Sequence, residues 1–325
     1  MERKEMAVHF TVIVNRIAGS GRGLQVWKQI EPQLQQQGID YTAHFTRYAG
    51  HATYMTRKLQ EQRRGQVDAE AVLVIGGDGT LHEALNGLMG PRDPYDERLP
   101  LAYIPAGTGN DFARGFGLSQ DPQKALQQVL SAQHAYKTCI GEYEEAIKGE
   151  HAYFLNNVGI GFDAAIVSRT NASKAKKRLN HAHVGSMSYL ANAISVLYNQ
   201  QPFTLMVENG RHHDLYPKAY MVIVSNHPFI GGGFRIAPDM SVDEDQLELL
   251  VAERRGWPLT AMQCWKFARG SLARSRYAHV YRGKKLHYST SSLEFGQTDG
   301  QEMGNRFVDI SFKTEHYPFW MVPEK

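Results

Sequence analysis

The 325-residue chain has little cysteine and no long hydrophobic run. Only Cys139 and Cys264 occur, far apart in the sequence, which excludes a disulfide framework and a zinc site built on cysteines. No stretch approaches the roughly 20 apolar residues that a helix needs to cross a bilayer. The first apolar stretch covers residues 8–14, and the residues that precede it are too polar to be typical of a signal peptide. We therefore expect a cytoplasmic protein that associates with membranes only peripherally.

Two common nucleotide-binding motifs and two common catalytic patterns are also missing. No Walker A sequence occurs, and Gly19, Gly21 and Gly23 do not have the spacing of a dinucleotide-binding loop, which argues against an ordinary ATPase and a dehydrogenase. Ser119 and Ser225 lie in no nucleophile elbow, so hydrolase chemistry has no support. The 14 histidines lack the spacing, with partners, of a zinc site.

The charged residues are present in ordinary number but are unevenly distributed. The net charge is +3, yet residues 254–285 contain nine Lys or Arg and no Asp or Glu, and residues 174–178 form a second basic cluster. Polarised charge favours contact with anionic surfaces such as lipid headgroups or nucleic acid, while an ordinary solvated face explains it equally well. Since no nucleic-acid module is recognisable, we expect no nucleic-acid partner and favour an anionic membrane surface.

The first part of the chain alternates strand and helix patterns. The apolar run at 71–75 is typical of a central parallel strand that is covered on both faces. The expected strands lie at 8–14, 41–46, 71–75 and 101–104, and the expected helices run from 24 to the stop at Gly38 and over 51–64, 81–89 and 122–130. This order predicts an α/β domain with an open parallel sheet and helices on both sides.

After about residue 133 the pattern changes to short apolar runs separated by turns, which is typical of an antiparallel sheet or sandwich. These runs lie at 153–158, 203–207, 220–224, 247–251, 286–289 and 307–312, with helices expected around 186–198 and 258–273. We predict an α/β nucleotide-binding domain over 1–133, which residues 314–325 could complete, and a β-rich domain over 134–313.

The helix expected at 258–273 carries a stripe of residues at helical spacing. Leu259, Met262, Trp265 and Arg269 fall along one side. Such a stripe is most often part of a core, although the neighbouring Arg and Trp residues also suit docking at a lipid headgroup layer.

A glycine-rich loop directly follows the apolar run 71–75 and precedes a helix. It consists of Gly76, Gly77, Asp78, Gly79 and Thr80. Glycines let the backbone approach a ligand, and a new helix offers N–H groups and a positive dipole end, so phosphate fits here. A carboxylate beside phosphate points to Mg²⁺ or to a hydroxyl proton between them. A tight strand–helix turn with a local Asp cap explains this loop alone equally well.

A second loop follows the next strand. Gly107 and Gly109 flank Thr108, whose hydroxyl could donate to a phosphate or a base, Asn110 could cap the following turn, and Asp111 is a second carboxylate. Loops after parallel strands converge at the carboxyl edge of a sheet, and the loop after the first strand leaves the same edge. Three converging loops predict a nucleotide site.

The two loops, GGDGTLHEALNGL and IPAGTGNDFARGFGL, resemble those of the diacylglycerol kinase catalytic-domain family, which includes sphingosine kinases and bacterial lipid kinases. The resemblance extends over most of the chain, through the turn from Asn15 to Gly19 and the segments 155–166, 231–251 and 297–300. It implies a nucleotide domain of the kind found in NAD kinases and phosphofructokinases. It also implies transfer of the γ-phosphoryl group of ATP to a lipid hydroxyl, with Mg²⁺, in a cleft between two domains.

The resemblance also implies roles for individual residues. Asp78 would orient Mg²⁺–ATP, and Asp111 would face the acceptor or the metal network. The residues that would hold the nucleotide are Asn15, Thr46, Gly76, Gly77, Asp78, Gly79, Thr80 and Thr108.

The chain departs from the family at the position of the catalytic base. Family members usually have Asp-Gly-Glu where this chain has Asp299, Gly300 and Gln301, and that Glu is regarded as the base. Because Gln does not accept a proton usefully, either Glu302 or Asp299 takes the role, or activity is weak or lost. A shift of one residue moves a strand side chain to the opposite face unless the loop bends there.

A second departure concerns a structural Mg²⁺ that the family holds with a carboxylate and flanking carbonyls. Here Glu244 matches the carboxylate position, with carbonyls from Ser241 and Gln246. Glu is one methylene longer than the usual Asp, and this acidic segment could equally be a solvated turn.

We therefore predict an ATP- and Mg²⁺-dependent lipid kinase with a diacylglycerol-like acceptor. A soluble kinase of the NAD kinase or phosphofructokinase type is one alternative, against which the segment GTGNDFA argues. A non-catalytic nucleotide- or lipid-binding protein is another, suggested by Gln301. The sequence leaves the acceptor lipid and a homodimer open.

Overall fold

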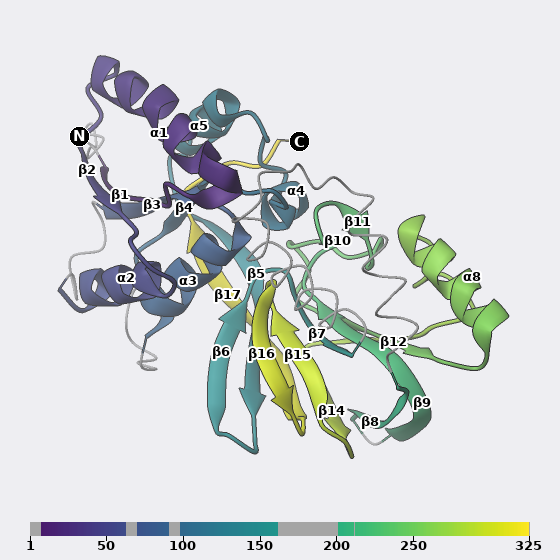
Figure 1. Ribbon diagram of the computed structural model, residues 1–325. Helices are drawn as coiled ribbons and strands as arrows, with labels where there is room; N and C mark the ends of the chain where they lie inside the picture. The colour runs from purple at the N-terminus through teal and green to yellow at the C-terminus, as the bar shows by residue number, and fades with distance from the viewer. Residues whose placement is uncertain (1–7, 63–69, 91–97, 162–200, 211, 325) are drawn as a thin grey trace, which may run out of the picture. The chain divides into compact units, whose positions relative to one another are not determined.

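The chain divides into two compact units. A computed structural model of the chain (Figure 1) describes residues 8–62, 70–90, 98–161, 201–210 and 212–324. The first unit comprises Met1–Ile140, Gly231–Gly233 and His316–Lys325, and the second comprises Gly141–Ile230 and Phe234–Glu315. The boundaries expected from the sequence lay near residues 133 and 314. The helix expected at 186–198 and the basic cluster at 174–178 lie outside the described residues.

The first unit has the α/β architecture that the sequence predicts. Its elements are β1 (His9–Val14), α1 (Ala18–Gln36), β2 (Tyr41–Phe45), α2 (His51–Gln62), β3 (Glu70–Gly76), α3 (Asp78–Met89), β4 (Leu101–Pro105), α4 (Asp111–Phe116) and α5 (Pro122–Leu130). The strands are parallel in the order β2-β1-β3-β4. The end of β17 (Asp309–Phe319) pairs in parallel with β4, through Phe319 and Leu101.

The interior of this sheet follows from the apolar pattern of its strands. Every residue of β3 is buried, as the continuous apolar run predicts. Helices α1 and α5 pack together on one side of the sheet, and helices α2 and α3 pack together on the other side (Figure 1). At the start of α5 the Asp121 carboxylate accepts the N–H groups of Gln123 and Lys124, at 2.9 and 3.1 Å, and Pro122 occupies the first turn. Both features favour a helix start at this position.

The second unit is β-rich, again as predicted. Its elements are β5 (Tyr136–Glu145), β6 (Glu150–Phe154), β7 (Asn157–Gly161), β8 (Phe203–Asn209), β9 (His212–Ser225), β10 (Phe229–Ile230), β11 (Phe234–Arg235), β12 (Leu247–Glu253), α8 (Trp257–Ala268), β13 (His279–Gly283), β14 (Lys285–Thr290), β15 (Glu294–Thr298) and β16 (Gln301–Arg306). Antiparallel pairing gives the order β16-β15-β7-β9-β8-β14-β17, and β12 pairs with β9 and β13. The division between the units falls within β5 and β17.

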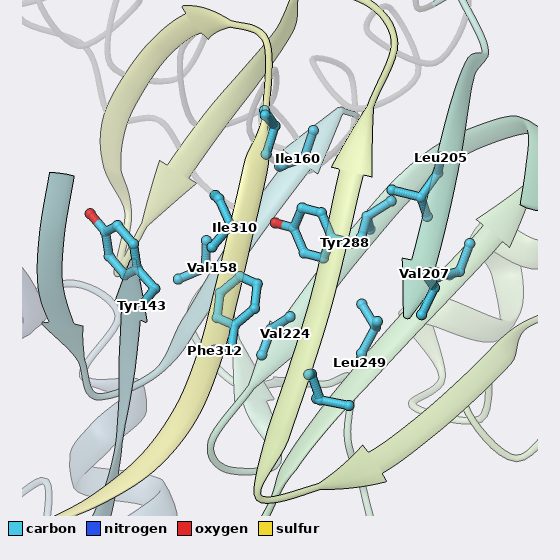
Figure 2. Close-up of a cluster of buried hydrophobic side chains, with 14 of the residues drawn as sticks. Tyr143, Val158, Ile160, Leu205, Val207, Val224, Leu249, Tyr288, Ile310 and Phe312 are labelled. Carbon is cyan, nitrogen blue, oxygen red and sulfur yellow. The ribbon is translucent and has the colours of Figure 1, made fainter. Parts of the chain in front are cut away.

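The core of the second unit collects side chains from several antiparallel strands. Val158, Val224, Leu249, Tyr288 and Phe312 belong to one buried cluster (Figure 2). They come from β7, β9, β12, β14 and β17, so one hydrophobic interior joins strands that are far apart in the sequence. Among the described residues, every helix is too short or too polar to pass through a membrane.

Candidate active site

The loops after β3 and β4 meet back to back at the carboxyl edge of the parallel sheet. A Cβ atom on Gly107 would lie 2.6 Å from the Cα of Gly77, and one on Gly77 would lie 3.1 Å from the Cα of Gly107. The Ala106 N–H donates to the Gly76 carbonyl at 2.6 Å. Glycine is therefore required at both positions because the two backbones touch.

The loop after β1 joins the other two. The Asn15 side-chain amide donates to the Thr80 hydroxyl, with 2.9 Å between the nitrogen and the oxygen. A Cβ on Gly19 would collide with the Ala106 carbonyl oxygen, and Gly19 has a left-handed φ of 55°. The backbone stays left-handed through Ser20 and Gly21, so regular helix in α1 begins only after this turn. All three predicted loops thus lie together in the first unit.

Asp78 connects the β3–α3 loop to the next helix. Its carboxylate accepts the backbone N–H of Asp111 at 3.2 Å and that of Phe112 at 3.1 Å. These N–H groups form the first turn of α4, where a negative charge is favoured by the helix dipole. Asp78 therefore caps a helix that begins 33 residues later in the sequence.

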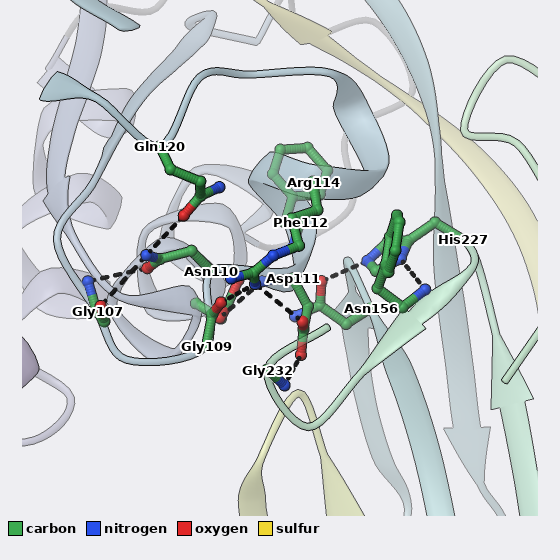
Figure 3. A network of polar contacts seen from close by, with 12 residues as sticks. Gly107, Gly109, Asn110, Asp111, Phe112, Arg114, Gln120, Asn156, His227 and Gly232 are labelled. Atoms are coloured by element: carbon green, nitrogen blue, oxygen red, sulfur yellow. Dashed lines mark hydrogen bonds and ion pairs between the residues drawn. The ribbon is translucent and has the colours of Figure 1, made fainter. Parts of the chain in front are cut away.

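The prediction that Asn110 caps this turn is wrong. Asn110 has a left-handed backbone, with φ of 55° and ψ of 45°, and its side chain makes no capping hydrogen bond. Instead its amide oxygen accepts the Gly107 N–H at 2.9 Å, and its amide nitrogen donates to Gln120 at 3.1 Å (Figure 3). Because Asp78 already caps α4, Asn110 instead stabilises the glycine loop.

Asp111 is a second carboxylate close to Asp78. It is buried, and its Oδ2 accepts the Gly232 N–H at 2.8 Å while Arg114 lies 3.3 Å from Oδ1 (Figure 3). Burial raises the pKa of the Asp111 carboxyl group, although Gly232 and Arg114 act in the opposite direction. A Cβ on Gly109 would lie 3.2 Å from Asp78 Oδ2 and 3.8 Å from Asp111 Oδ2. Both carboxylates thus lie beside Gly109, where a side chain would be tightly packed against Asp78.

The two predicted nucleotide-binding threonines lie at the rim of this arrangement. Thr46 follows β2, and its N–H donates to the Val14 carbonyl at 3.0 Å, next to Asn15. Thr108 is exposed at the tip of the second glycine loop. Both hydroxyl groups are therefore placed on the same edge of the sheet as the glycine loops.

A pocket of about 560 Å³ opens beside Thr46. It is lined by Arg16, Ala43, His44, Phe45, Arg47, His51 and Met55. The Arg16 guanidinium lies 5.3 Å from the centroid of the Phe45 ring, and the Tyr48 and His51 rings stack with 4.5 Å between centroids. The sequence reasoning named none of these lining residues, although it named Thr46, which lies between Phe45 and Arg47 in the chain. The signal available was the mixture of Arg, His and aromatic residues within 44–54.

In the second unit, Asp299 occupies a tight turn between β15 and β16. Asp299 and Gly300 have φ values of 48° and 80°, as a two-residue hairpin of type I′ requires. The Asp299 carboxylate accepts the N–H groups of Leu155, Asn156 and Asn157 at 2.8, 2.8 and 3.0 Å. It holds the bend between β6 and β7, which explains why the single apolar run expected at 153–158 forms two strands.

His227 lies beside this bend. Its Nδ1 accepts the Phe229 N–H at 3.1 Å, so Nε2 carries the proton and donates to the Asn156 side-chain oxygen at 2.6 Å (Figure 3). Burial lowers the pKa of the His227 imidazole to about 4, despite an opposing effect of Asp299. His227 is therefore a neutral structural residue. The sequence reasoning missed it because nothing in its local sequence indicates a partner 71 residues away.

Both units match known families. Residues 9–139 match the family described as "Diacylglycerol kinase catalytic domain", and residues 156–315 match the "YegS C-terminal NAD kinase beta sandwich-like domain". The chain therefore carries a diacylglycerol kinase catalytic domain followed by a C-terminal domain of the YegS type. The predicted resemblance is thereby confirmed, together with the fold class.

Relatives of similar length carry names that agree with this family. The chain is 27% identical over 306 residues to "Putative lipid kinase YtlR" of Bacillus subtilis, covering 91% of this chain and 94% of that protein. It is 27% identical over 194 residues to "Putative lipid kinase SAS0691" of Staphylococcus aureus, covering 59% and 57%.

Solved structures share the fold. One titled "Crystal structure of a putative diacylglycerol kinase from Bacillus anthracis str. Sterne" aligns with a TM-score of 0.70 and 23% identity, covering 97% of this chain and 98% of that one. A second diacylglycerol kinase structure from the same organism aligns with a TM-score of 0.69 and 21% identity, covering 99% of both chains.

The strand that carries Gln301 places Glu302 differently from the family's Glu. Gln301 pairs with Thr298 across the hairpin and Glu302 pairs with Gln297, so the first two residues of β16 are in register, and the register shifts only beyond Glu302. Successive side chains of a strand point to opposite faces. Glu302 therefore does not take the place of the Gln301 side chain, and its role as base stays a prediction against which this geometry argues.

The three predicted ligands of a structural Mg²⁺ are arranged as a hydrogen-bonded turn. The Glu244 N–H donates to the Ser241 carbonyl at 3.1 Å, and the Gln246 side-chain amide donates to the Glu244 carboxylate. Within the described ranges, no group of three or more His, Cys, Asp or Glu residues is placed to hold a metal ion. The Glu244 carboxylate is thus bound by the Gln246 side chain in this structure, and a metal site at Ser241, Glu244 and Gln246 stays a prediction.

Proposed function

We propose that this protein transfers the γ-phosphoryl group of ATP, bound as its Mg²⁺ complex, to the hydroxyl group of a diacylglycerol-like lipid. The observation that carries the proposal is the convergence of three glycine-containing loops with Asp78 and Asp111 beside Gly109. The diacylglycerol kinase catalytic domain and the relatives that are named lipid kinases support the class of acceptor.

The first unit offers places for both ends of the nucleotide. The triphosphate would lie over Gly76–Gly79 at the start of α3, where the helix dipole is positive. Asn15 and Thr80 hold the loop in shape through their hydrogen bond. The pocket beside Thr46, with Arg16, Phe45 and His51 in its lining, would accept the base.

The chemistry needs positioning and neutralisation of charge more than a strong base. In a loose phosphoryl-transfer transition state, the bond from the γ-phosphorus to the bridging oxygen is largely broken before the lipid oxygen attaches. Asp78 would orient the Mg²⁺–ATP complex, and Asp111 would accept a hydrogen bond from the lipid hydroxyl. Burial raises the pKa of Asp111, which improves its capacity to receive the hydroxyl proton after attack. Gln301 has no comparable capacity.

The test is transfer of labelled phosphate from ATP with Mg²⁺ into an extracted lipid mixture. We expect an organic-soluble labelled product with the wild-type protein and a loss of about 100-fold or more with Asp78→Asn. Asp40→Asn, a change of an exposed carboxylate in the same unit, is the matched control and keeps full activity. Labelled NAD or sugar phosphate in place of lipid would contradict the proposal and favour a soluble kinase.

A second candidate, a protein that binds nucleotide without transferring phosphate, is favoured by Gln301 alone. Measurement of ATP binding by calorimetry separates the two. Binding with no labelled lipid in any acceptor mixture would support the non-catalytic function, whereas binding accompanied by transfer excludes it.

A further inference from the structure

Helix α8 buries polar residues and exposes large apolar ones. Its buried side chains are Thr260 and Gln263, while Trp257, Met262 and Trp265 are 49%, 42% and 50% exposed. Cys264 and Phe267 of the same helix pack, partly buried, against the core of the second unit, so the helix has an inner apolar side and a second, exposed apolar side. A helix that packs against a core normally has only the first. The interpretation of the stripe through Met262 and Trp265 as core packing is therefore wrong, because the opposite side of the helix faces the interior.

Hydrogen bonds fix this orientation. The Gln263 amide donates to the carbonyls of Glu253, at 3.2 Å, and Tyr277, at 2.7 Å, and it accepts the Tyr220 hydroxyl at 3.3 Å. The Thr260 hydroxyl donates to the Gly256 carbonyl at 2.9 Å. Rotation of the helix about its axis would leave these buried polar groups without hydrogen-bond partners. The hydrogen bonds therefore keep the apolar side of α8 exposed.

Arginine side chains accompany both exposed tryptophans. The Arg254 guanidinium carbon lies 4.4 Å from the centroid of the Trp257 ring, and that of Arg269 lies 4.3 Å from the Trp265 ring. No acidic residue occurs between 254 and 285 in the sequence. We call Arg254, Trp257, Met262, Trp265 and Arg269 the α8 surface.

This surface lies at one edge of the second unit, where α8 runs beside β11 (Figure 1). Along the helix, Met262, Trp265 and Arg269 follow each other at steps of three and four residues, so they share one side. The surface therefore combines a continuous apolar strip with positive charge, in a segment that supplies no negative charge of its own.

We propose that the α8 surface docks the protein onto an anionic phospholipid bilayer. Trp is favoured at the level of the headgroups because its ring is apolar and its N–H is polar. Arg pairs with phosphate through two parallel hydrogen bonds, and its apolar stem lies along the ring beneath it. The helix lies in the plane of the interface, with Met262 and the two Trp side chains directed toward the acyl region.

The combination of arginine, tryptophan and methionine side chains on the α8 surface favours a lipid bilayer as its partner. A nucleic acid would use the positive charge and could stack bases on the two Trp rings, but it offers no apolar environment for Met262. An interface between two copies of this chain would bring the two sets of arginines toward each other, since a twofold axis places the same surface on both partners. An anionic bilayer satisfies both the charge and the apolar strip.

Vesicle binding tests the proposal without any nucleotide or phosphoryl transfer. We expect the full-length protein to sediment with vesicles of phosphatidylcholine mixed with phosphatidylglycerol and far less with phosphatidylcholine alone. Trp257→Ser combined with Trp265→Ser should weaken binding to the mixed vesicles by about 10-fold or more. The matched control is Leu215→Ser with Phe307→Ser, which removes two exposed apolar side chains elsewhere in the second unit and leaves binding unchanged.

Charge reversal tests the other half of the surface. Arg254→Glu with Arg269→Glu should abolish the preference for phosphatidylglycerol, whereas Lys124→Glu with Lys148→Glu, the same change in charge at exposed lysines outside the surface, should keep most of it. Quenching of tryptophan fluorescence by brominated lipid should occur in the wild-type protein and be largely lost in the double Trp variant, because the two remaining tryptophans lie in the first unit, Trp27 buried and Trp320 partly buried.

Three results would overturn the proposal. The first is unchanged vesicle binding in the double Trp variant. The second is equal loss in the control variant, which would show a general effect of surface apolarity. The third is a wild-type dimer in sedimentation velocity that the Trp changes convert to a monomer without affecting vesicle binding, which would assign the surface to contact between copies.

Discussion

The two units use their family-motif carboxylates in different ways. In the first unit, Asp78 accepts two backbone N–H groups, and Asp111 lies with it around Gly109 at a loop edge. In the second unit, Asp299 accepts three backbone N–H groups from one bend. Both aspartates therefore hold the backbone in place through the N–H groups that they accept. The difference is that Asp78 lies beside a second carboxylate, Asp111, whereas the carboxylate of Asp299 is surrounded by the backbone of one bend.

The largest expected effect is a loss of stability in the second unit. Asp299→Ala leaves three buried N–H groups without their acceptor, so we expect the free energy of unfolding to fall by about 3–5 kcal/mol. Urea denaturation followed by circular dichroism measures this. Asp243→Ala, in an exposed turn of the same unit, is the control. A loss below about 1 kcal/mol for Asp299→Ala would contradict the anchoring role.

Asp111→Asn should separate activity from stability in the first unit. The amide oxygen still accepts the Gly232 N–H, and burial already disfavours the charged form, so stability should change by about 1 kcal/mol or less. The rate of labelled lipid formation should fall by about 100- to 1000-fold, because the proposed mechanism needs a carboxylate at Asp111 to receive the proton of the acceptor hydroxyl. An unchanged rate would remove Asp111 from the reaction.

Acid should weaken the second unit through His227. Burial lowers its pKa from 6.5 to about 4, so between these pH values the unfolded chain binds more protons than the folded one. The stabilisation is complete above pH 6.5 and is lost as the pH falls toward 4, by up to about 3 kcal/mol.

Denaturation at a series of pH values, on the wild type and on His227→Gln, measures this effect. Gln supplies both a donor for Asn156 and an acceptor for the Phe229 N–H, so its curve should be flatter over the same range. Two curves of identical slope would show that other groups cause the acid sensitivity.

The smallest expected effect concerns the hairpin beside Asp299. Gln301→Glu restores the family's carboxylate and should raise the rate of phosphate transfer by about tenfold. Glu302→Gln, on the opposite face of β16, should leave the rate unchanged. The reverse pattern, in which only the change at Glu302 matters, would require the strand to be rearranged when substrate binds.

Much of the fold and part of the candidate site could be predicted from the sequence. The alternation of strands and helices, the buried run of β3 and the glycine loops depend on patterns within a few residues, and the structure confirms them. Gly77 and Gly107 could be placed at one edge because parallel strands bring successive loops together. The resemblance to the diacylglycerol kinase catalytic domain, which the family model confirms over residues 9–139, followed from the same local motifs.

Only the tertiary structure decided which partners the polar side chains meet. Asp78 caps a helix 33 residues away, and Asp299 holds a bend 142 to 144 residues away. Helix α8 presents Trp265 to solvent because Gln263 finds acceptors on two other segments. Local spacing determines which residues share a face, but the direction of that face depends on the hydrogen-bond partners that distant parts of the chain supply.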